Sequence, residues 1–104
     1  MDIRATIAPV GSANTPAIVT SAGTAIAAND ARGAWMIQNV GTNALFVNYG
    51  GTASSTVFHV VLKGGTGDSD GLGGSISQES GVVFTGAISV AGTTPKFVVT
   101  ELTA

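Results

Sequence analysis

Two apolar runs flank a short polar turn in residues 34–50, which read AWMIQNV-GTN-ALFVNYG. Both runs are rich in the aromatic and β-branched residues that strands favour. A three-residue loop can combine a type I turn with a residue in the left-handed region, and Gly41 or Asn43 can take that conformation at little steric cost. We therefore predict a β-hairpin over residues 34–50.

Shorter apolar stretches, separated by clusters of Gly, Pro, Ser and Asn, continue this pattern along the chain. The stretches at 75–79 and 81–85 are expected to form a second hairpin that turns at Ser80 and Gly81. The remaining candidate strands are residues 17–20, 24–28, 56–63, 87–91 and 96–102. About eight short strands without an amphipathic helix predict an all-β fold, an antiparallel β-sandwich of the jelly-roll-like kind, formed as a single domain by residues 1–104.

Several strands carry apolar residues on both alternating faces. Residues 56–63, TVFHVVLK, and both halves of the expected central hairpin show this pattern. One opposing sheet covers only one face of a strand, so the other face needs a loop or a neighbouring chain. The pattern therefore favours contacts between copies of the chain.

The first ten residues differ from the compact strand pattern. Residues 2–8 alternate loosely around Ile3, Ala5 and Ile7, and Pro9 then removes a backbone donor. We expect this segment to be an edge strand or an N-terminal arm, with Ile3, Arg4 and Ile7 at an interface.

Residues 64–74, GGTGDSDGLGG, form the longest expected loop. Its glycines cannot fill a core, so we expect it to be exposed and either mobile or ordered by a partner, with Asp68, Asp70 and Leu72 at an interface. The two aspartates could share a cation, but Leu72 stands where an EF-hand loop starting at Asp68 needs a ligand. A solvated turn is the favoured interpretation.

The composition restricts the classes of partner. Only 10% of the residues are charged and the net charge is -2, against roughly 25% charged residues in an average soluble protein. The four basic residues are scattered, which argues against nucleic-acid binding. Some small β-proteins simply have a weakly charged surface, but we favour a surface that sister subunits or a larger assembly cover.

Candidate chemistry is sparse. The chain has no cysteine and a single histidine, His59, which we expect to be packed or at an interface rather than a metal ligand. No Gly-x-Ser-x-Gly or phosphate-binding motif is present, so we expect no enzymatic activity, no cofactor and no metal. The aromatic residues fit core layers better than a sugar-stacking platform, and Tyr49, next to Gly50, is the one most expected to reach the surface.

No secretory signal is expected, because Asp2 and Arg4 interrupt the start of the chain. No run of about 18 apolar residues occurs, so we expect no membrane-spanning helix.

Part of the chain resembles small virion proteins of tailed bacteriophages. The similarity extends over residues 31–102 and rests on WMIQNVGTN at 35–43, LFV at 45–47, Phe58-His59, LKGG at 62–65, Asp70-Gly71 and VVTEL at 98–102.

This resemblance implies a head decoration or cement protein, a small β-domain that is made in the host cytoplasm and sits on the assembled capsid. The implied partners are the major capsid protein and further copies of the chain, with a homotrimer favoured. The alternatives are a tail or baseplate component and, from another class, a carbohydrate-binding adhesion module.

Overall fold

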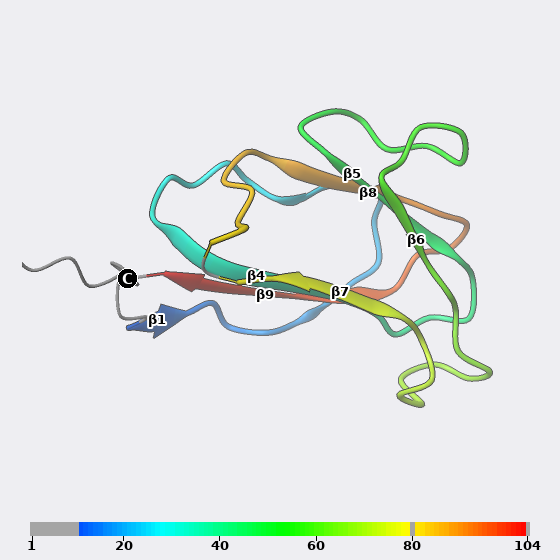
Figure 1. Ribbon diagram of the computed structural model, residues 1–104. Helices are drawn as coiled ribbons and strands as arrows, with labels where there is room; N and C mark the ends of the chain where they lie inside the picture. Colours follow the sequence, from blue (N-terminus) through cyan, green and yellow to red (C-terminus); the bar gives the residue numbers. More distant parts are fainter. Residues whose placement is uncertain (1–10, 80, 104) are drawn as a thin grey trace, which may run out of the picture.

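The protein is a two-layered β-sandwich in the computed structural model, which describes residues 11–79 and 81–103 (Figure 1). The described residues contain no helix. The segment expected to be an arm or edge strand, with Ile3, Arg4 and Ile7, lies outside the described residues. The predicted all-β antiparallel sandwich is confirmed.

Nine strands form two sheets, which we name sheet A and sheet B. Sheet A contains β1 (Ser12–Ala13), β2 (Ile18–Val19), β9 (Phe97–Thr103), β4 (Arg32–Asn39) and β7 (Ser75–Gln78). Sheet B contains β3 (Gly23–Ile26), β8 (Ile88–Ala91), β5 (Leu45–Tyr49) and β6 (Val60–Leu62). All pairs are antiparallel.

The strand pairing is nested. β2 pairs with β9, β3 with β8, β4 with β7, and β5 with β6. The chain changes sheet at every connection except β1 to β2 and β5 to β6. This nested order favours the jelly-roll arrangement among the sandwich folds, in which a long antiparallel ribbon is wound across both layers.

The core lies between the sheets, where strand alternation directs one side chain in two inward. Trp35 and Ile37 of β4 face Leu45 and Val47 of β5 in this layer, and all four are almost fully buried. The rest of the core is Ile26, Leu62, Ile88, Val90, Phe97 and Val99.

The predicted hairpin over residues 34–50 is wrong. Its two runs are the strands β4 and β5, but β4 belongs to sheet A and β5 to sheet B, so they do not pair. The polar turn between them crosses the end of the sandwich, because the N–H groups of Val40 and Gly41 both donate to the Lys96 carbonyl (2.9 and 3.1 Å). Gly65 N–H also donates to the Gly41 carbonyl (2.9 Å).

The expected second hairpin is also wrong. Residues 75–78 form β7, but residues 81–87 form no strand and cross from sheet A to sheet B. Gln78 Oε1 accepts hydrogen bonds from Phe84 N (2.8 Å) and Trp35 Nε1 (2.9 Å), so a side chain replaces the expected strand ladder.

Other strand predictions differ in length. Those at 17–20, 24–28, 87–91 and 96–102 are confirmed within a few residues as β2, β3, β8 and β9. The strand expected over 56–63 is limited to Val60–Leu62, because Ser54 and Val57 close a turn through reciprocal backbone hydrogen bonds. β1 lies in a stretch that composition alone assigns to a loop.

Candidate interaction surface

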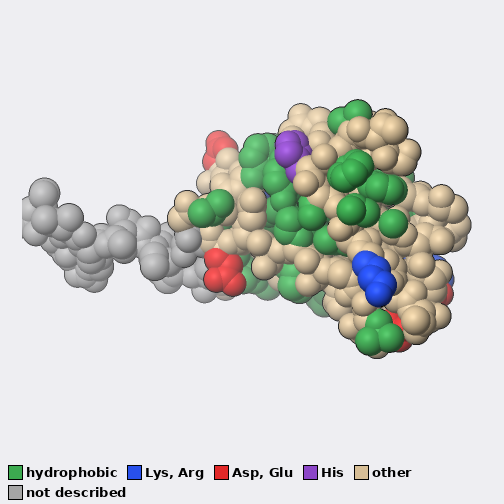
Figure 2. All heavy atoms as spheres, turned by 45° about the vertical axis from the view of Figure 1, so that its right-hand side comes forward, with side chains coloured by type: hydrophobic (Ala, Val, Ile, Leu, Met, Phe, Trp, Pro, Cys, Tyr) green, Lys and Arg blue, Asp and Glu red, His purple; other side chains and the backbone are tan. Residues whose placement is uncertain are grey.

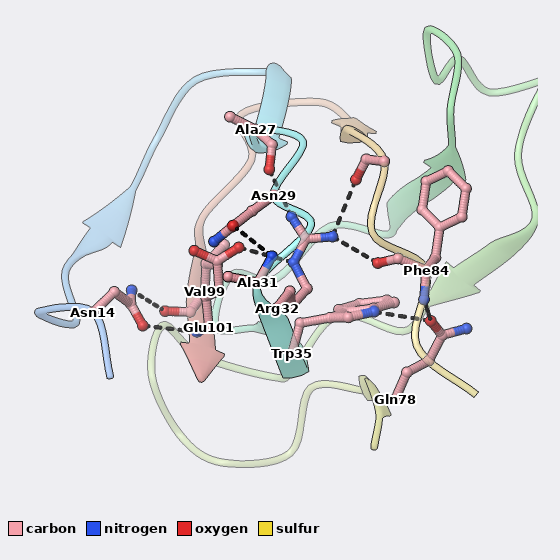
Figure 3. Close-up of polar contacts among 11 residues, drawn as sticks. Asn14, Ala27, Asn29, Ala31, Arg32, Trp35, Gln78, Phe84, Val99 and Glu101 are labelled. Carbon is pink, nitrogen blue, oxygen red and sulfur yellow. Dashed lines mark hydrogen bonds and ion pairs between the residues drawn. The ribbon is translucent and has the colours of Figure 1, made fainter. Parts of the chain in front are cut away.

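A buried cluster around Arg32 closes one end of the sandwich (Figure 3). The register between β4 and β9 shifts between Arg32 and Ala34, and this bulge turns Arg32 inward. Its side chain has 0% exposure and donates to Glu101 Oε2 (2.8 Å) and to the carbonyls of Phe84 (2.6 Å), Gly86 (3.0 Å) and Ala27 (2.6 Å). The guanidinium is thus a structural tie between crossing segments.

An aromatic cluster lies next to this end. Tyr49 is half-buried and contacts Trp35 edge-on (ring centroids 5.8 Å), Phe84 (5.8 Å) and the His59 ring, which is stacked at 4.7 Å. His59 is exposed, and its Nδ1 accepts a hydrogen bond from Tyr49 N (3.0 Å). Partial burial raises the pKa of the Tyr49 hydroxyl. These contacts anchor the end of β5 against the chain that returns to β6.

The outer face of sheet B has two different halves. One half, around Ser89, is covered by the chain's own residues 51–53, because Ser89 Oγ donates to the Gly51 carbonyl and accepts from Ala53 N. An open groove of about 310 Å³ runs beside this cover. Its lining is small and uncharged, with Thr24, Thr52 and Ser89 as the hydroxyl-bearing residues, so it offers no reactive group.

The other half is an apolar area, which we call the sheet B patch, formed by Phe46, Phe58 and Val61. Phe46 and Val61 are cross-strand partners on β5 and β6, and Phe58 packs on Phe46 with ring centroids 5.0 Å apart. Val61 is 47% exposed and Phe58 is 41% exposed. Figure 2 shows hydrophobic side chains gathered on the face that carries the purple histidine. Val61 and Phe58 stay exposed within the described residues, so cover of this outer face by a neighbouring chain remains a prediction.

The loop at 64–74 is ordered by its own hydrogen bonds. Asp70 Oδ2 accepts from Thr66 N (2.9 Å), Thr66 Oγ1 (2.9 Å) and Gly67 N (2.8 Å), and Asp70 Oδ1 accepts from Leu72 N (2.9 Å). These bonds lower the pKa of the Asp70 carboxyl to about 2. A Cβ at Gly65 would overlap Asp70 Oδ1, so this glycine is needed for the close approach.

Two further residues of the loop lie on its surface. Asp68 forms an ion pair with Lys96, which fixes the loop to the turn before β9. Leu72 is 63% exposed. Asp68, Asp70 and Leu72 thus share one loop near the start of β5, whereas Tyr49 lies at the other end of that strand. The structure does not bring Tyr49 together with the loop residues.

The described residues contain no group of three or more His, Cys, Asp or Glu side chains that could hold a metal ion. The oxygens of Asp70 are committed to the loop, and Asp68 is paired with Lys96. No helix in the described part of the chain is long and apolar enough to cross a membrane.

Sequence reasoning missed three polar residues that organise these surfaces: Arg32, Asn39 and Ser89. Asn39 is buried, and its Nδ2 donates to the carbonyls of Asn43 (2.8 Å), Leu62 (3.1 Å) and Lys63 (3.2 Å). A polar residue in the inward register of β4, two positions after Ile37, is the signal that could have identified Asn39.

No protein-family model matches the chain, and no curated protein or solved structure matches it either.

Proposed function

We propose that the chain is a structural virion protein that decorates and stabilises the capsid of a tailed bacteriophage through multivalent protein–protein contacts. The resemblance of residues 31–102 to small virion proteins supports this role, and the major capsid protein is the proposed partner. The proposal includes further copies of the chain, as a trimer, and a place on the outside of the shell.

The observation that carries the proposal is the number of large apolar side chains on a weakly charged surface. Six of them are exposed in the described residues, on both sheets and on three loops: Ile18, Val57, Phe58, Val61, Leu72 and Val82. Exposed apolar area that exceeds the needs of a monomer is typical of surfaces that partners cover. Proteins that bind large assemblies need such surfaces more than they need a cleft.

We assign the shell contact to the loop at 64–74. Asp70 holds this loop in one conformation through four hydrogen bonds, and Leu72 projects from it with 63% of its surface exposed. An ordered apolar tip binds at a low entropic cost, because little conformational freedom is lost on binding.

The proposed mechanism is mass action. A protein that binds only the expanded shell stabilises that state by RT ln(1 + [L]/Kd). Three linked subunits convert weak individual contacts into avidity, since the second and third contacts form at a high effective concentration.

Binding to capsids tests the proposal. Heads of the phage that encodes the chain, purified after deletion of its gene, are mixed with the purified protein and sedimented. We expect saturable binding, and at least tenfold weaker binding for Leu72→Ser than for the matched surface variant Val82→Ser. Failure of the wild-type chain to bind heads would refute the proposal.

The same preparation separates the alternatives. A tail or baseplate component would sediment with tails rather than heads. A carbohydrate-binding module would give signals on a glycan array, whereas a decoration protein is expected to give none.

A further inference from the structure

We infer that the sheet B patch of one copy binds residues 2–8 of a second copy, so that the chain self-associates by exchanging its N-terminal segment. This inference deepens the proposed function, on which its biological setting rests, by naming an intersubunit contact. Its test uses the isolated protein, so its failure is distinguishable from a failure to bind capsids.

The patch is an apolar surface on which an extended chain can bind. Phe46 and Val61 lie side by side on neighbouring strands, and Phe58 continues the apolar surface beyond them. The adjoining half of the same face is already covered by the chain's own residues 51–53, held by Ser89. Among the described strands, β6 pairs only with β5, so it is an edge of sheet B. An extended segment beside β6 would cover the remaining half.

Residues 2–8 have the alternating apolar sequence that binding to this surface requires. Ile3, Ala5 and Ile7 recur at every second position, which places them on one face of an extended segment. Asp2 precedes this apolar set. Lys63 directly follows β6, is exposed and forms no ion pair with any other described residue, so it can attract Asp2 at the border of the patch.

Ile7 cannot reach Val61 of its own chain. Gly11 is fixed at one end of β9, where its N–H donates to the Thr103 carbonyl (2.9 Å). Val61 lies toward the opposite end, because Asn39, the partner of Phe97, bonds to the carbonyl of the neighbouring Leu62. Figure 1 shows β1 and β6 at opposite ends of the molecule.

The distance between these two ends exceeds the length of chain that could span it. From Phe97 to Thr103, β9 spans about 20 Å, and the patch lies a further layer away, on the outer face of the other sheet. Ile7 lies four positions before Gly11, a reach of about 14 Å at full extension. Ile7 therefore contacts Val61 only on another copy.

The exchange has a consequence for assembly. Each copy donates one segment and offers one patch, so two copies can exchange segments reciprocally, or three can pass them on head-to-tail. Such a contact forms a closed ring when the rotation between copies closes, which is compatible with the proposed trimer.

Disulfide trapping tests the contact directly, because the natural chain has no cysteine. Ile7→Cys and Val61→Cys are made in separate chains, mixed and oxidised. We expect a cross-linked dimer with one chain of each kind, in at least fivefold higher yield than from Ile7→Cys mixed with Val82→Cys. Val82 is the matched control because it is also exposed but lies outside the patch. Yields equal to the control would overturn the inference.

A double variant separates exchange from docking within one chain. With both cysteines in one molecule, exchange predicts linked dimers and larger species in dilute solution. A monomer with an internal disulfide would contradict it.

Sedimentation velocity supplies a measurement without cysteines. We expect the wild-type chain to self-associate, and both Ile3→Ser/Ile7→Ser and Phe58→Ser/Val61→Ser to weaken self-association at least tenfold. Ile18→Ser, an exposed apolar site on sheet A, is expected to change it less than twofold. A wild-type monomer at all concentrations, or equal effects of all three variants, would refute the exchange.

Discussion

Arg32 and Asp70 both use a charged side chain to hold irregular backbone in place, but they do so in opposite surroundings. Arg32 is fully buried and binds three carbonyls and the Glu101 carboxylate. Asp70 is exposed and accepts four hydrogen bonds from its own loop. The first closes the end of the sandwich, and the second shapes a loop on its surface.

The difference shows where charge determines the fold and where it only shapes the surface. A buried charge must have partners, since removing one leaves desolvated groups behind. An exposed carboxylate can exchange its hydrogen bonds for water at a small cost. We therefore expect substitutions at Arg32 to affect folding and substitutions at Asp70 to affect local loop structure.

The largest effect is expected for Arg32→Met. The substitution leaves the carbonyls of Ala27, Phe84 and Gly86 without their donor, and breaking a buried charged network typically costs about 3–5 kcal/mol. Urea denaturation followed by Trp35 fluorescence measures this change in the free energy of unfolding. Glu101→Gln is the control, because it keeps a hydrogen-bond acceptor for Arg32 and should cost less. Equal stability of Arg32→Met and the wild type would show that the Arg32 hydrogen bonds do not stabilise this end of the sandwich.

Asn39→Ala should have an intermediate effect. Asn39 is buried but uncharged, and its loss leaves the buried Leu62 carbonyl and the part-buried Lys63 carbonyl without this donor. The expected cost is about 1–3 kcal/mol in the free energy of unfolding. The matched variant Asn43→Ala removes an exposed side chain bonded to the Thr93 carbonyl, so its cost should be smaller. A larger loss in the free energy of unfolding for Asn43→Ala than for Asn39→Ala would show that Asn39 does not stabilise the connection between β4 and β5.

The contribution of Asp70 to stability should depend on pH. Its carboxyl has a pKa of about 2 in the folded chain, below the ordinary value of 3.8. The charged form is therefore favoured by folding, and its contribution is present above pH 4 and lost as the pH falls from about 4 to 2. We expect unfolding of Asp70→Asn to depend less on pH in this range than unfolding of the wild type. Identical pH profiles would exclude a role for the charged carboxylate.

The smallest effect on folding is expected for the exposed apolar residues. Val61→Ser and Leu72→Ser remove side chains that are 47% and 63% exposed, so each should change the free energy of unfolding by about 0.5 kcal/mol or less. Thermal melts at low protein concentration measure this. A cost above that of Asn39→Ala would show that these residues stabilise the monomer rather than an interface.

The sequence pattern predicted the class of fold because strand-forming runs and turn residues are local signals. It failed for the connection between β4 and β5, since a polar turn of the same composition can close a hairpin or cross between sheets. The choice depends on where the turn's backbone groups bond. Here they bond to Lys96 and Gly65, which are remote in sequence.

Long-range polar contacts also limit how far the surface features can be predicted from the sequence. Arg32 falls in a stretch that composition assigns to a turn, and its burial depends on a bulge and on carbonyls up to 54 positions away. The loop at 64–74 was correctly predicted to be exposed at Asp68, Asp70 and Leu72. The hydrogen bonds that order it depend on local geometry that glycine content alone does not specify.

Electron cryomicroscopy of phage particles tests the central claim most directly. On the proposed function a tailed phage encodes the chain, and its particles are compared with particles from which the gene has been deleted. We predict small β-sandwich density on the outer capsid surface that is missing after deletion, with the loop at 64–74 against the shell. Unchanged capsid density, or missing density at the tail or baseplate instead, would contradict a role in capsid decoration.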